Sequence, residues 1–410
     1  MTRPFLGPSV VGVTFLTLMG AFGLNLTGGQ FFTPLSQSYN WDLTTLSLAV
    51  SLNMLTWGIL QPVMGRLIDR FGAKFVLTGS ALLMGVSFLL SSTITEVWQF
   101  FLYYGVFTGI GFAGCGSMAN SVLVSQWYVK KRPMMLARSS MGINVGQLIL
   151  LPLTGMLIAN TGFRSAFLVL GSFMLLIVVP SILLIVKSNP NEVGQNPDGM
   201  VESYSAASLP KSISLPEALN SSYFWTTTVG FMTCGYTLYL VTTHLPKYAF
   251  DLGGGTALGG QLLGLAAAAS AVSMWFTGQL SKSLSKKTLL IGFYSLRAIA
   301  FIWLATSTQV EQLYLFAIVY GVSSFPIIPL VTSLIGNRFG ATAMGSILGF
   351  AWLVHQVAAA MGVFLGGYLR SNSGNYHLAF WSCAVLLGMG TLVTLLINEQ
   401  QTILPSTQPS

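Results

Sequence analysis

The sequence predicts an all-α membrane protein with twelve transmembrane helices in two six-helix bundles, and its composition and patterning support this. Of the 410 residues, 53% are hydrophobic and only 7% are charged, against about 25% charged residues in a typical soluble domain. The mean hydropathy is +0.71. Apolar runs of about 20 residues, the length that crosses a bilayer, recur from one end of the chain to the other. We therefore expect the chain to function inside a membrane.

Twelve apolar runs define the expected spans. The first run is too long for the core of a signal peptide, and we interpret it as a retained span. A polar interval rich in Pro, Asn, Ser and Gly divides the runs into six and six. We therefore expect an N-terminal bundle at 1–187, a cytoplasmic central loop at 188–220 with a short surface helix near its end, and a C-terminal bundle at 221–410. The expected spans are 10–33, 44–64, 75–93, 98–127, 139–160, 165–187, 221–246, 258–280, 288–306, 312–336, 343–369 and 377–398.

Basic residues determine the expected orientation. With a cytoplasmic N-terminus, three basic residues, Arg164, Lys247 and Arg370, fall outside. Positive residues that flank short loops stay in the cytoplasm, so we predict that both termini are cytoplasmic and that the protein lies in the cell (inner) membrane. This placement explains the net charge of +8 without a nucleic-acid partner. The basic residues on the cytoplasmic side are Arg3, Arg66, Arg70, Lys74, Lys130, Lys131, Arg132, Arg138, Lys187, Lys211, Lys282, Lys286, Lys287 and Arg338.

A motif with a glycine at each end joins the second and third spans. It reads Gly65-Arg66-Leu67-Ile68-Asp69-Arg70-Phe71-Gly72-Ala73-Lys74. Its glycines permit close helix approach and a tight reversal, and its acid can pair with a basic neighbour or a helix N-terminus. The matching place in the second half reads Gly278-Gln279-Leu280-Ser281-Lys282, where the acid is lost. These copies resemble the signature loop of the major facilitator superfamily, which implies two duplicated six-helix bundles and makes Gly65, Asp69, Arg70 and Gly72 candidate gating residues.

Weaker stretches are similar to the bacterial monocarboxylate porter and oxalate/formate antiporter group. The resemblance implies alternating access of two bundles around a central site that carries small organic anions, often with a proton. Members typically have an arginine in span eight, where this chain has Ser273-Met274-Trp275-Phe276, and oxalate exchangers have a lysine in span eleven, where this chain offers His355. The stretches that carry the resemblance are Pro34-Leu35 with Asn40-Trp41, Gln126-Trp127-Tyr128, His244-Leu245-Pro246 and His355-Gln356.

No acidic residue lies in the middle of an expected span, because the outer loops contain four and the other six lie in or beside the cytoplasm. A cation site in hydrocarbon needs a carboxylate to offset its desolvation, so the sequence predicts an anionic or neutral substrate. The cysteines lie in apolar runs and predict neither a disulfide framework nor a metal site. We expect no cofactor. The outer acids are Asp42, Glu96, Asp251 and Glu311, and the cysteines are Cys115, Cys234 and Cys383.

Four polar residues in the spans are candidate functional residues. Arg297 lies about nine residues into span nine, roughly 13 Å deep, and either binds a carboxylate or ties a peripheral helix to its neighbours. His355, with Gln356 beside it, lies near the middle of span eleven and either carries a proton and binds the anion or bonds to a neighbouring helix. His244, expected to be more exposed, either gates the outer side or packs the end of span seven.

Further polar groups near mid-depth complete the candidate site. Each one either forms a hydrogen bond to the substrate or joins two helices. As a set, they are expected to include part of the binding site. These substrate-binding candidates are Asn25, Asn120, Asn144, Gln147, Tyr236 and Tyr320, with Asn53 and Tyr239 at similar depth.

A secondary transporter fits the twelve spans, the two halves and the signature loop. The chain has no Gly-x4-Gly-Lys-Ser/Thr loop for an ATP-driven pump, and its spans lack the convergent acids or metal ligands of an enzyme. The leading interpretation is a transporter of a small organic anion, a monocarboxylate, with or without a proton. The alternatives are an exporter of a neutral or amphipathic solute and, more remotely, a non-transporting sensor. We expect a monomer whose partners are the lipid bilayer and a small-molecule substrate.

Overall fold

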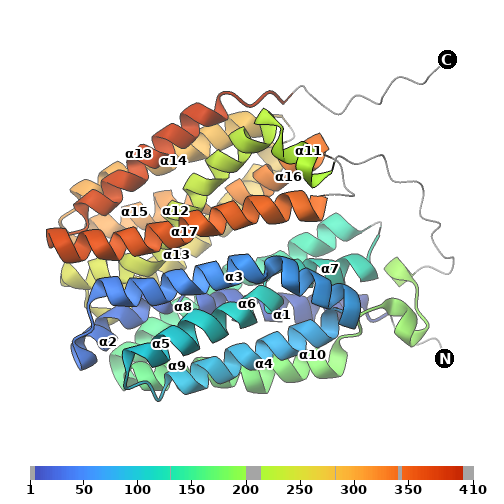
Figure 1. Ribbon diagram of the computed structural model, residues 1–410, viewed down its shortest axis with the longest axis horizontal. Coiled ribbons are helices and arrows are strands. Elements are labelled where there is room, and N and C mark those ends of the chain that lie inside the picture. The colour runs from blue at the N-terminus through green and yellow to red at the C-terminus, as the bar shows by residue number, and fades with distance from the viewer. Residues whose placement is uncertain (1–4, 130, 200–213, 282, 340–343, 400–410) are drawn as a thin grey trace.

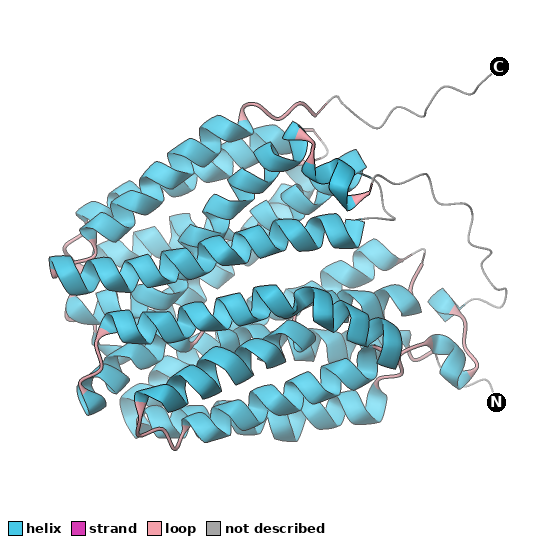
Figure 2. Ribbon diagram, viewed as in Figure 1, coloured by secondary structure: helices cyan, strands magenta, loops and turns pink. Residues whose placement is uncertain are grey.

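The computed structural model describes residues 5–129, 131–199, 214–281, 283–339 and 344–399. This part of the chain is helical with short connections and contains no strand (Figure 2). Within it, eleven helices or runs of consecutive helical segments are long and apolar enough to cross a membrane. Helices satisfy every backbone hydrogen bond inside one segment, which a bilayer core requires. The predicted all-α polytopic membrane architecture is therefore confirmed.

The first half of the chain forms one bundle, drawn in blue to green in Figure 1. Each expected span coincides with one helix or with several consecutive helical segments. In order, the segments are α1 (Gly7–Asn25), η1 (Gly28–Phe31), α2 (Phe32–Tyr39), α3 (Leu43–Phe71), α4 (Ala73–Ser91), α5 (Val97–Phe100), η2 (Phe101–Thr108), α6 (Gly109–Cys115), α7 (Ser117–Trp127), α8 (Arg132–Thr161), α9 (Phe163–Phe173), η3 (Met174–Val178) and α10 (Val179–Ile185).

The second half forms another bundle, drawn in yellow-green to red in Figure 1. The seventh expected span is α12 (Ser222–Asp251), 30 residues long, which is not among the eleven apolar spans because threonine and tyrosine make it more polar. The central segment contributes η4 (Pro190–Val193), η5 (Pro197–Gly199) and the expected short helix α11 (Leu215–Leu219). The remaining helices are α13 (Gly255–Leu280), α14 (Lys286–Thr306), α15 (Val310–Ser324), α16 (Ile327–Phe339), α17 (Met344–Ser373) and α18 (His377–Thr394).

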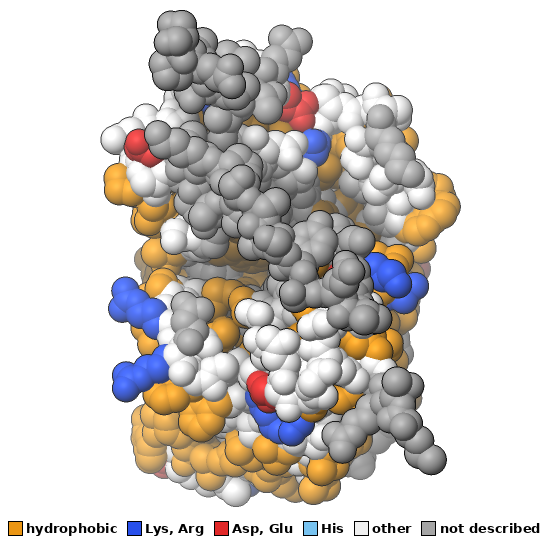
Figure 3. Space-filling model, turned by 90° about the vertical axis from the view of Figure 1, so that its right-hand side faces the viewer, with side chains coloured by type: hydrophobic (Ala, Val, Ile, Leu, Met, Phe, Trp, Pro, Cys, Tyr) orange, Lys and Arg blue, Asp and Glu red, His pale blue; other side chains and the backbone are white. Residues whose placement is uncertain are grey.

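The two ends of the molecule differ in charge. Helix α1 begins and α18 ends at the same end, where α11 and η5 also lie; we call it the inner end and the opposite one the outer end (Figure 1). Figure 3 views the inner end and shows lysine and arginine side chains around its rim. This arrangement agrees with the predicted cytoplasmic placement of both termini. Arg3, Lys130, Lys211 and Lys282 lie outside the described residues.

Hydrogen bonds repeat at matching positions of the two halves. At the inner end, the ammonium of Lys74 donates to the carbonyl of Leu183 at 2.7 Å, and Lys287 donates to the carbonyl of Leu395 at 2.7 Å. Each bond joins the third span of its half to the sixth. Two further bonds recur at the outer end. The bond from Arg164 to Ser92 in the first half matches the one between His377 and Ala305 in the second. The bond from Tyr39 to Ile94 likewise matches the one from Tyr248 to Ser307. This recurrence supports the predicted division into duplicated halves.

Three spans are interrupted near their middle. Span one changes from α1 to η1 after Asn25, span four has an extended backbone at Gly116, and span ten turns at Phe325 and Pro326. Breaks of this kind release backbone groups from the helical ladder and are typical of substrate sites in secondary transporters. Hydropathy alone predicts uninterrupted spans at these three places.

Candidate functional site

The two halves meet along α3 with α17 and along α8 with α13. Glycines allow the closest approaches. A Cβ at Gly29 in η1 would overlap the carbonyl oxygen of Thr243 in α12, and one at Gly155 in α8 would lie 3.0 Å from the carbonyl oxygen of Ala257 in α13. Both contacts lie towards the outer end, and the Gly29 contact adjoins the interruption of span one. The outer end is therefore closed.

An aromatic cluster joins the halves at mid-depth. Trp57 in α3 lies 4.5 Å from the ring of Phe112 in its own half. Across the interface, its centroid lies 6.2 Å from Tyr239 in α12 and 6.2 Å from Trp352 in α17. We call Trp57, Phe112, Phe231, Tyr239 and Trp352 the aromatic cluster. The cluster therefore lies where the two halves meet at mid-depth.

His355 lies in the middle of this cluster and is fully buried. Its ring is 4.3 Å from Phe231 and 4.9 Å from Trp352. Nδ1 lies 3.0 Å from Oε1 of Gln356, so the oxygen accepts and Nδ1 carries the proton in this orientation. Nε2 of a neutral ring is then an acceptor. Protonation turns that atom into a donor and gives the ring a positive charge.

Three polar atoms of this region are buried without a hydrogen-bond partner: Nε1 of Trp57, Nε2 of His355 and Nε2 of Gln356. Gln356 also lies at the interface, because a Cβ at Gly58 of α3 would stand 3.0 Å from its Cβ. A buried polar group without a partner costs about 1–3 kcal/mol. The two N–H groups of Trp57 and Gln356 can donate to an acceptor that binds between the halves.

Arg297 is fully buried, but its contacts lie within the C-terminal half. Nη1 is 3.4 Å from the sulfur of Cys234 and 3.3 Å from the hydroxyl of Thr237, both in α12. Nη2 donates to the carbonyl of Ser323 in α15, and the guanidinium lies 5.6 Å from the ring centroid of Tyr320. The arginine thus ties α14 to two neighbouring helices, which favours the structural alternative over carboxylate binding.

Two polar side chains near the break in span one have no hydrogen-bond partner. Both amide atoms of Asn25 are buried without a hydrogen bond, and so are both of Gln30. The backbone of Asn25 is held by the hydroxyl of Tyr104, which donates to its carbonyl at 2.5 Å. Asn53 donates to the carbonyl of Tyr104 at 2.8 Å. Gln30, which the sequence analysis missed, lies in η1 at the closed outer end.

Asn120 and Asn144 have different surroundings. Nδ2 of Asn120 lies 2.9 Å from the carbonyls of Cys115 and Gly116, so this side chain stabilises the break in span four. Nδ2 of Asn144 lies 3.5 Å from the sulfur of Met274 in the opposite half. Met274 belongs to the segment of span eight where the resemblance led us to expect an arginine, and its thioether contacts the N-terminal half there.

Three other candidates bond within their own half. The hydroxyl of Tyr236 lies 2.9 Å from that of Ser382 in α18. The hydroxyl of Tyr320 donates to the carbonyl of Leu238 at 3.3 Å, and Gln147 donates to the carbonyl of Ile143 one helical turn earlier at 3.4 Å. The hydroxyls of Tyr236 and Tyr320 are therefore engaged away from the interface between the halves.

The signature loop makes its reversal at Gly72. This residue has φ of +82°, which favours glycine, and a Cβ would stand 2.7 Å from the hydroxyl of Ser188. Gly65 has more space, because only Met118 lies within 4 Å of an added Cβ, at 3.7 Å. The guanidinium of Arg70 lies 5.1 Å from the ring of Phe71. The side chain of Asp69 lies outside the described residues.

His244 is fully buried, so the expectation that it is more exposed is wrong. Nε2 lies 2.8 Å from the carbonyl of Val363, and Nδ1 lies 3.3 Å from the hydroxyl of Tyr376. The physical reason is Gly366, whose missing side chain leaves room for the imidazole against α17. In the other half, the ring of Phe32 lies 5.7 Å away. His244 therefore packs the outer end of α12 beside the contact between the halves.

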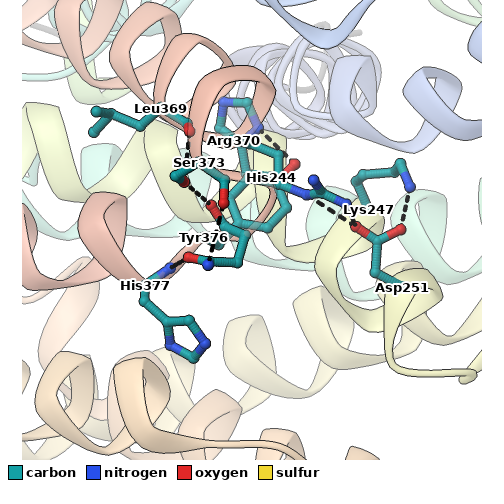
Figure 4. Close-up of polar contacts among 9 residues, drawn as sticks. His244, Lys247, Asp251, Leu369, Arg370, Ser373, Tyr376 and His377 are labelled. Atoms are coloured by element: carbon teal, nitrogen blue, oxygen red, sulfur yellow. Dashed lines mark hydrogen bonds and ion pairs between the residues drawn. The ribbon is translucent and has the colours of Figure 1, made fainter.

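A small ionic network lies next to His244 (Figure 4). Asp251 pairs with Lys247 one turn earlier in α12. Its other oxygen lies 3.1 Å from Nη2 of Arg370 in α17, and the guanidinium of Arg370 lies 5.7 Å from the ring of Tyr376. All three charges are partly exposed, so the network joins two helices of the same half at the outer surface.

The structure brings His355 and Gln356 together with the five residues of the aromatic cluster, of which only Tyr239 was a candidate from the sequence. Trp57 and Trp352 were not predicted as site residues, because a tryptophan in an apolar span usually only packs against neighbouring helices. A detectable signal was the indole N–H, which a bilayer core does not satisfy. This His355 site, lined by both halves, is the candidate functional site.

Two bundles around a mid-membrane site with interrupted helices define a secondary transporter rather than an enzyme. The model of the Major Facilitator Superfamily matches residues 13–363. The chain belongs to this superfamily and is a membrane transporter.

Relatives and solved structures agree with this assignment. The uncharacterized MFS-type transporter YcxA of Bacillus subtilis is 26% identical over 395 residues, 93% of this chain and 94% of the relative. Monocarboxylate transporter 13 of Rattus norvegicus is 23% identical over 393 residues, 95% of this chain and 89% of the relative. A bacterial homolog to the human lysosomal transporter Spinster, in an inward-facing and occupied conformation, has the same fold, with a TM-score of 0.74, 12% identity and 97% of each chain covered.

Proposed function

We propose that the protein carries a small organic anion, a monocarboxylate, between the two halves by alternating access. The observation that carries the proposal is the set of unpartnered atoms on Trp57, His355 and Gln356 at the interface. The indole and amide N–H groups suit the oxygens of a carboxylate. The similarity to monocarboxylate transporter 13 of the rat supports the same substrate class.

The charge distribution supports an anion over a cation. All acids of the chain lie outside the middle of the spans, so nothing in the site offsets a buried positive charge. A protonated His355 offers the opposite charge to a carboxylate at the place where the two halves meet. Binding the anion and a proton together then brings a net neutral pair into the site, which lowers the cost of desolvation.

His355 is the proposed proton carrier. In its neutral form, with Nδ1–H bonded to Gln356, the free Nε2 presents a lone pair that repels a carboxylate oxygen. Once protonated, the same atom donates to it. Proton and anion binding therefore favour each other, which is the linkage that symport requires. We also propose the cell (inner) membrane, cytoplasmic termini and a monomer.

Uptake into proteoliposomes tests this function. The purified protein is reconstituted, and uptake of labelled lactate, pyruvate and oxalate is measured with and without an inward proton gradient, against liposomes without protein. We expect saturable uptake of a monocarboxylate that the gradient stimulates. Absence of protein-dependent uptake of every monocarboxylate tested, aromatic acids included, would contradict the proposal.

Export of a neutral or amphipathic solute is the second candidate. Two observations favour it: Met274 stands in the segment where related carriers have an arginine, and Arg297 is engaged inside its own half. The site then holds no permanent charge, which suits an uncharged solute. Protein-dependent accumulation of an amphipathic dye in inside-out vesicles, together with no carboxylate uptake, would support this candidate over the first.

A further inference from the structure

We infer that the carried acid is planar and aromatic, so that its ring lies against Trp57 and Trp352 while its carboxylate binds the polar atoms of Trp57, His355 and Gln356. This inference rests on the proposed function and narrows its substrate class. It starts from the observation that the unpartnered nitrogens of Trp57 and His355 belong to rings in contact with the aromatic cluster, and that Gln356, whose amide nitrogen is also unpartnered, adjoins His355.

The aromatic walls come from both halves of the transporter. Trp57 belongs to α3 and Trp352 to α17, and their ring centroids are 6.2 Å apart with planes inclined at 45°. A flat ring that touches two others face to face needs about 7 Å between them, two contacts of about 3.5 Å each. The two indoles are closer than this and their planes are inclined, so a flat ring can lie between them only after the halves move apart and the indoles turn towards parallel. The relative movement of the halves during transport provides such a change.

A saturated ring fits this geometry less well. A puckered ring is thicker than a flat one, and it has no π-face with which to form an aromatic pair with an indole. Offset-stacked or edge-to-face aromatic pairs also gain about 0.5–1.5 kcal/mol beyond the burial of their area. A flat aromatic acid therefore gains from both walls, whereas a saturated acid of the same size gains only from burial and from its carboxylate.

The polar atoms belong to one wall or adjoin the other. His355 is 4.9 Å from Trp352 and Gln356 follows it in the helix, while the indole N–H belongs to Trp57 itself. A carboxylate attached directly or by one carbon to an aromatic ring spans this arrangement, because its oxygens and its ring face different groups. Short aliphatic acids such as lactate reach the polar atoms but leave the rings uncovered.

Benzoate and cyclohexanecarboxylate form the matched pair that tests the inference. Both are monocarboxylates of similar size that are ionised at neutral pH, and they differ in the flatness and π-face of the ring. Their binding to the purified transporter in detergent is measured by titration calorimetry, alongside uptake of labelled lactate and pyruvate into proteoliposomes. We expect benzoate to bind about threefold to tenfold more tightly.

The outcomes separate the two proposals. Equal affinities for the two ring acids, with carboxylate uptake present, would overturn the aromatic inference and leave the proposed function standing. No binding of either acid and no uptake of lactate or pyruvate would overturn the proposed function, and the inference with it. Tighter binding of benzoate supports both.

Substitutions at the two tryptophans distinguish the contribution of the aromatic rings to binding from that of the indole N–H group. Trp352→Leu and Trp57→Leu each remove a wall and are expected to reduce the benzoate preference to about twofold or less. Trp57→Phe keeps a ring but removes the N–H, so it is expected to weaken both acids while keeping their ratio. Trp98→Phe, at an exposed tryptophan of α5, is the control. Trp352→Phe should restore the ratio lost in Trp352→Leu, which a folding defect alone does not explain.

Discussion

The guanidinium of Arg297 lies 5.6 Å from the ring centroid of Tyr320, on the same helix whose Ser323 carbonyl accepts one of its N–H groups. A cation held by a ring, a carbonyl and the groups of α12 has no need of a substrate carboxylate. The buried arginine of span nine is thus explained by packing of the C-terminal half.

Replacing Arg297 by Gln is expected to lower the free energy of unfolding by about 2 kcal/mol, because hydrogen bonds from a charged group contribute about 1.5–3 kcal/mol each. Thermal melting in detergent measures this, and Arg138→Gln, at an exposed arginine of the inner end, is the control. The KM for the transported acid should change less than about twofold. A tenfold rise in KM with unchanged melting would show that Arg297 contacts the substrate.

Replacing His355 by Gln is expected to abolish the stimulation of uptake by a proton gradient, because the amide cannot take up the proton. Counterflow of labelled pyruvate without a gradient should persist at a reduced rate, since Gln still donates to the anion. His377→Gln is the matched control, at an exposed histidine that bonds to the carbonyl of Ala305 at the outer end. Undiminished stimulation in His355→Gln would exclude this residue as the proton carrier.

Replacing Gly29 by Ala is expected to prevent closure of the outer end. The added Cβ overlaps the backbone carbonyl of Thr243, and backbone cannot move aside as a flexible side chain does. We expect a shift towards an outward-open state, seen as greater labelling of a cysteine placed at Thr243 from the outside and loss of transport. Gly12→Ala, on α1 with nothing within 4 Å of the new Cβ, should behave like the parent protein. Equal labelling in the two variants would exclude Gly29 as part of the closure.

Asp42 gives the stability of the outer end a pH dependence. Partial burial raises the pKa of its carboxyl, but hydrogen bonds from the hydroxyl and N–H of Thr45 and from the N–H of Thr44 outweigh burial and lower it overall. A carboxyl with a lowered folded-state pKa stabilises the fold above its unfolded pKa of about 3.9 and loses this contribution as pH falls through the folded value.

Asp42→Asn keeps a good helix cap for α3 and removes the titration. Between pH 5 and acid pH, the melting temperature of this variant should therefore fall less than that of the parent protein. Asp42→Ala should lower stability by about 1 kcal/mol already at neutral pH, because it removes the cap. Parallel pH profiles for the parent and Asp42→Asn would contradict the assigned role of the carboxyl.

Hydropathy predicted the helices well, because a bilayer leaves few alternatives to an apolar helix. The breaks at Gly116 and at Phe325 with Pro326 escaped it, since glycine and proline also occur inside unbroken membrane helices and tertiary contacts decide the outcome. The sequence also does not show which neighbouring helix covers a given side chain. The position of His244 near the end of its span predicted exposure. In the structure, the space left by Gly366 lets α17 cover the imidazole.

The sequence predicted only part of the candidate site. His355 and Gln356 stood out because polar groups are rare in apolar spans. Trp57 and Trp352 did not, because only the structure shows that two tryptophans far apart in the chain meet between the halves. The charge of Arg297 made it a candidate from the sequence. Its partners are a carbonyl and a thiol on other helices, which a single sequence does not predict.

The polarity of α12 has a consequence for biogenesis. Most of its side chains are covered by neighbouring helices, and its sequence is less apolar than that of the eleven other spans found in the described chain. A nascent segment of this kind gains little by partitioning into lipid alone. We expect α12 to leave the translocon only together with later helices, which makes membrane insertion of the second half a cooperative event.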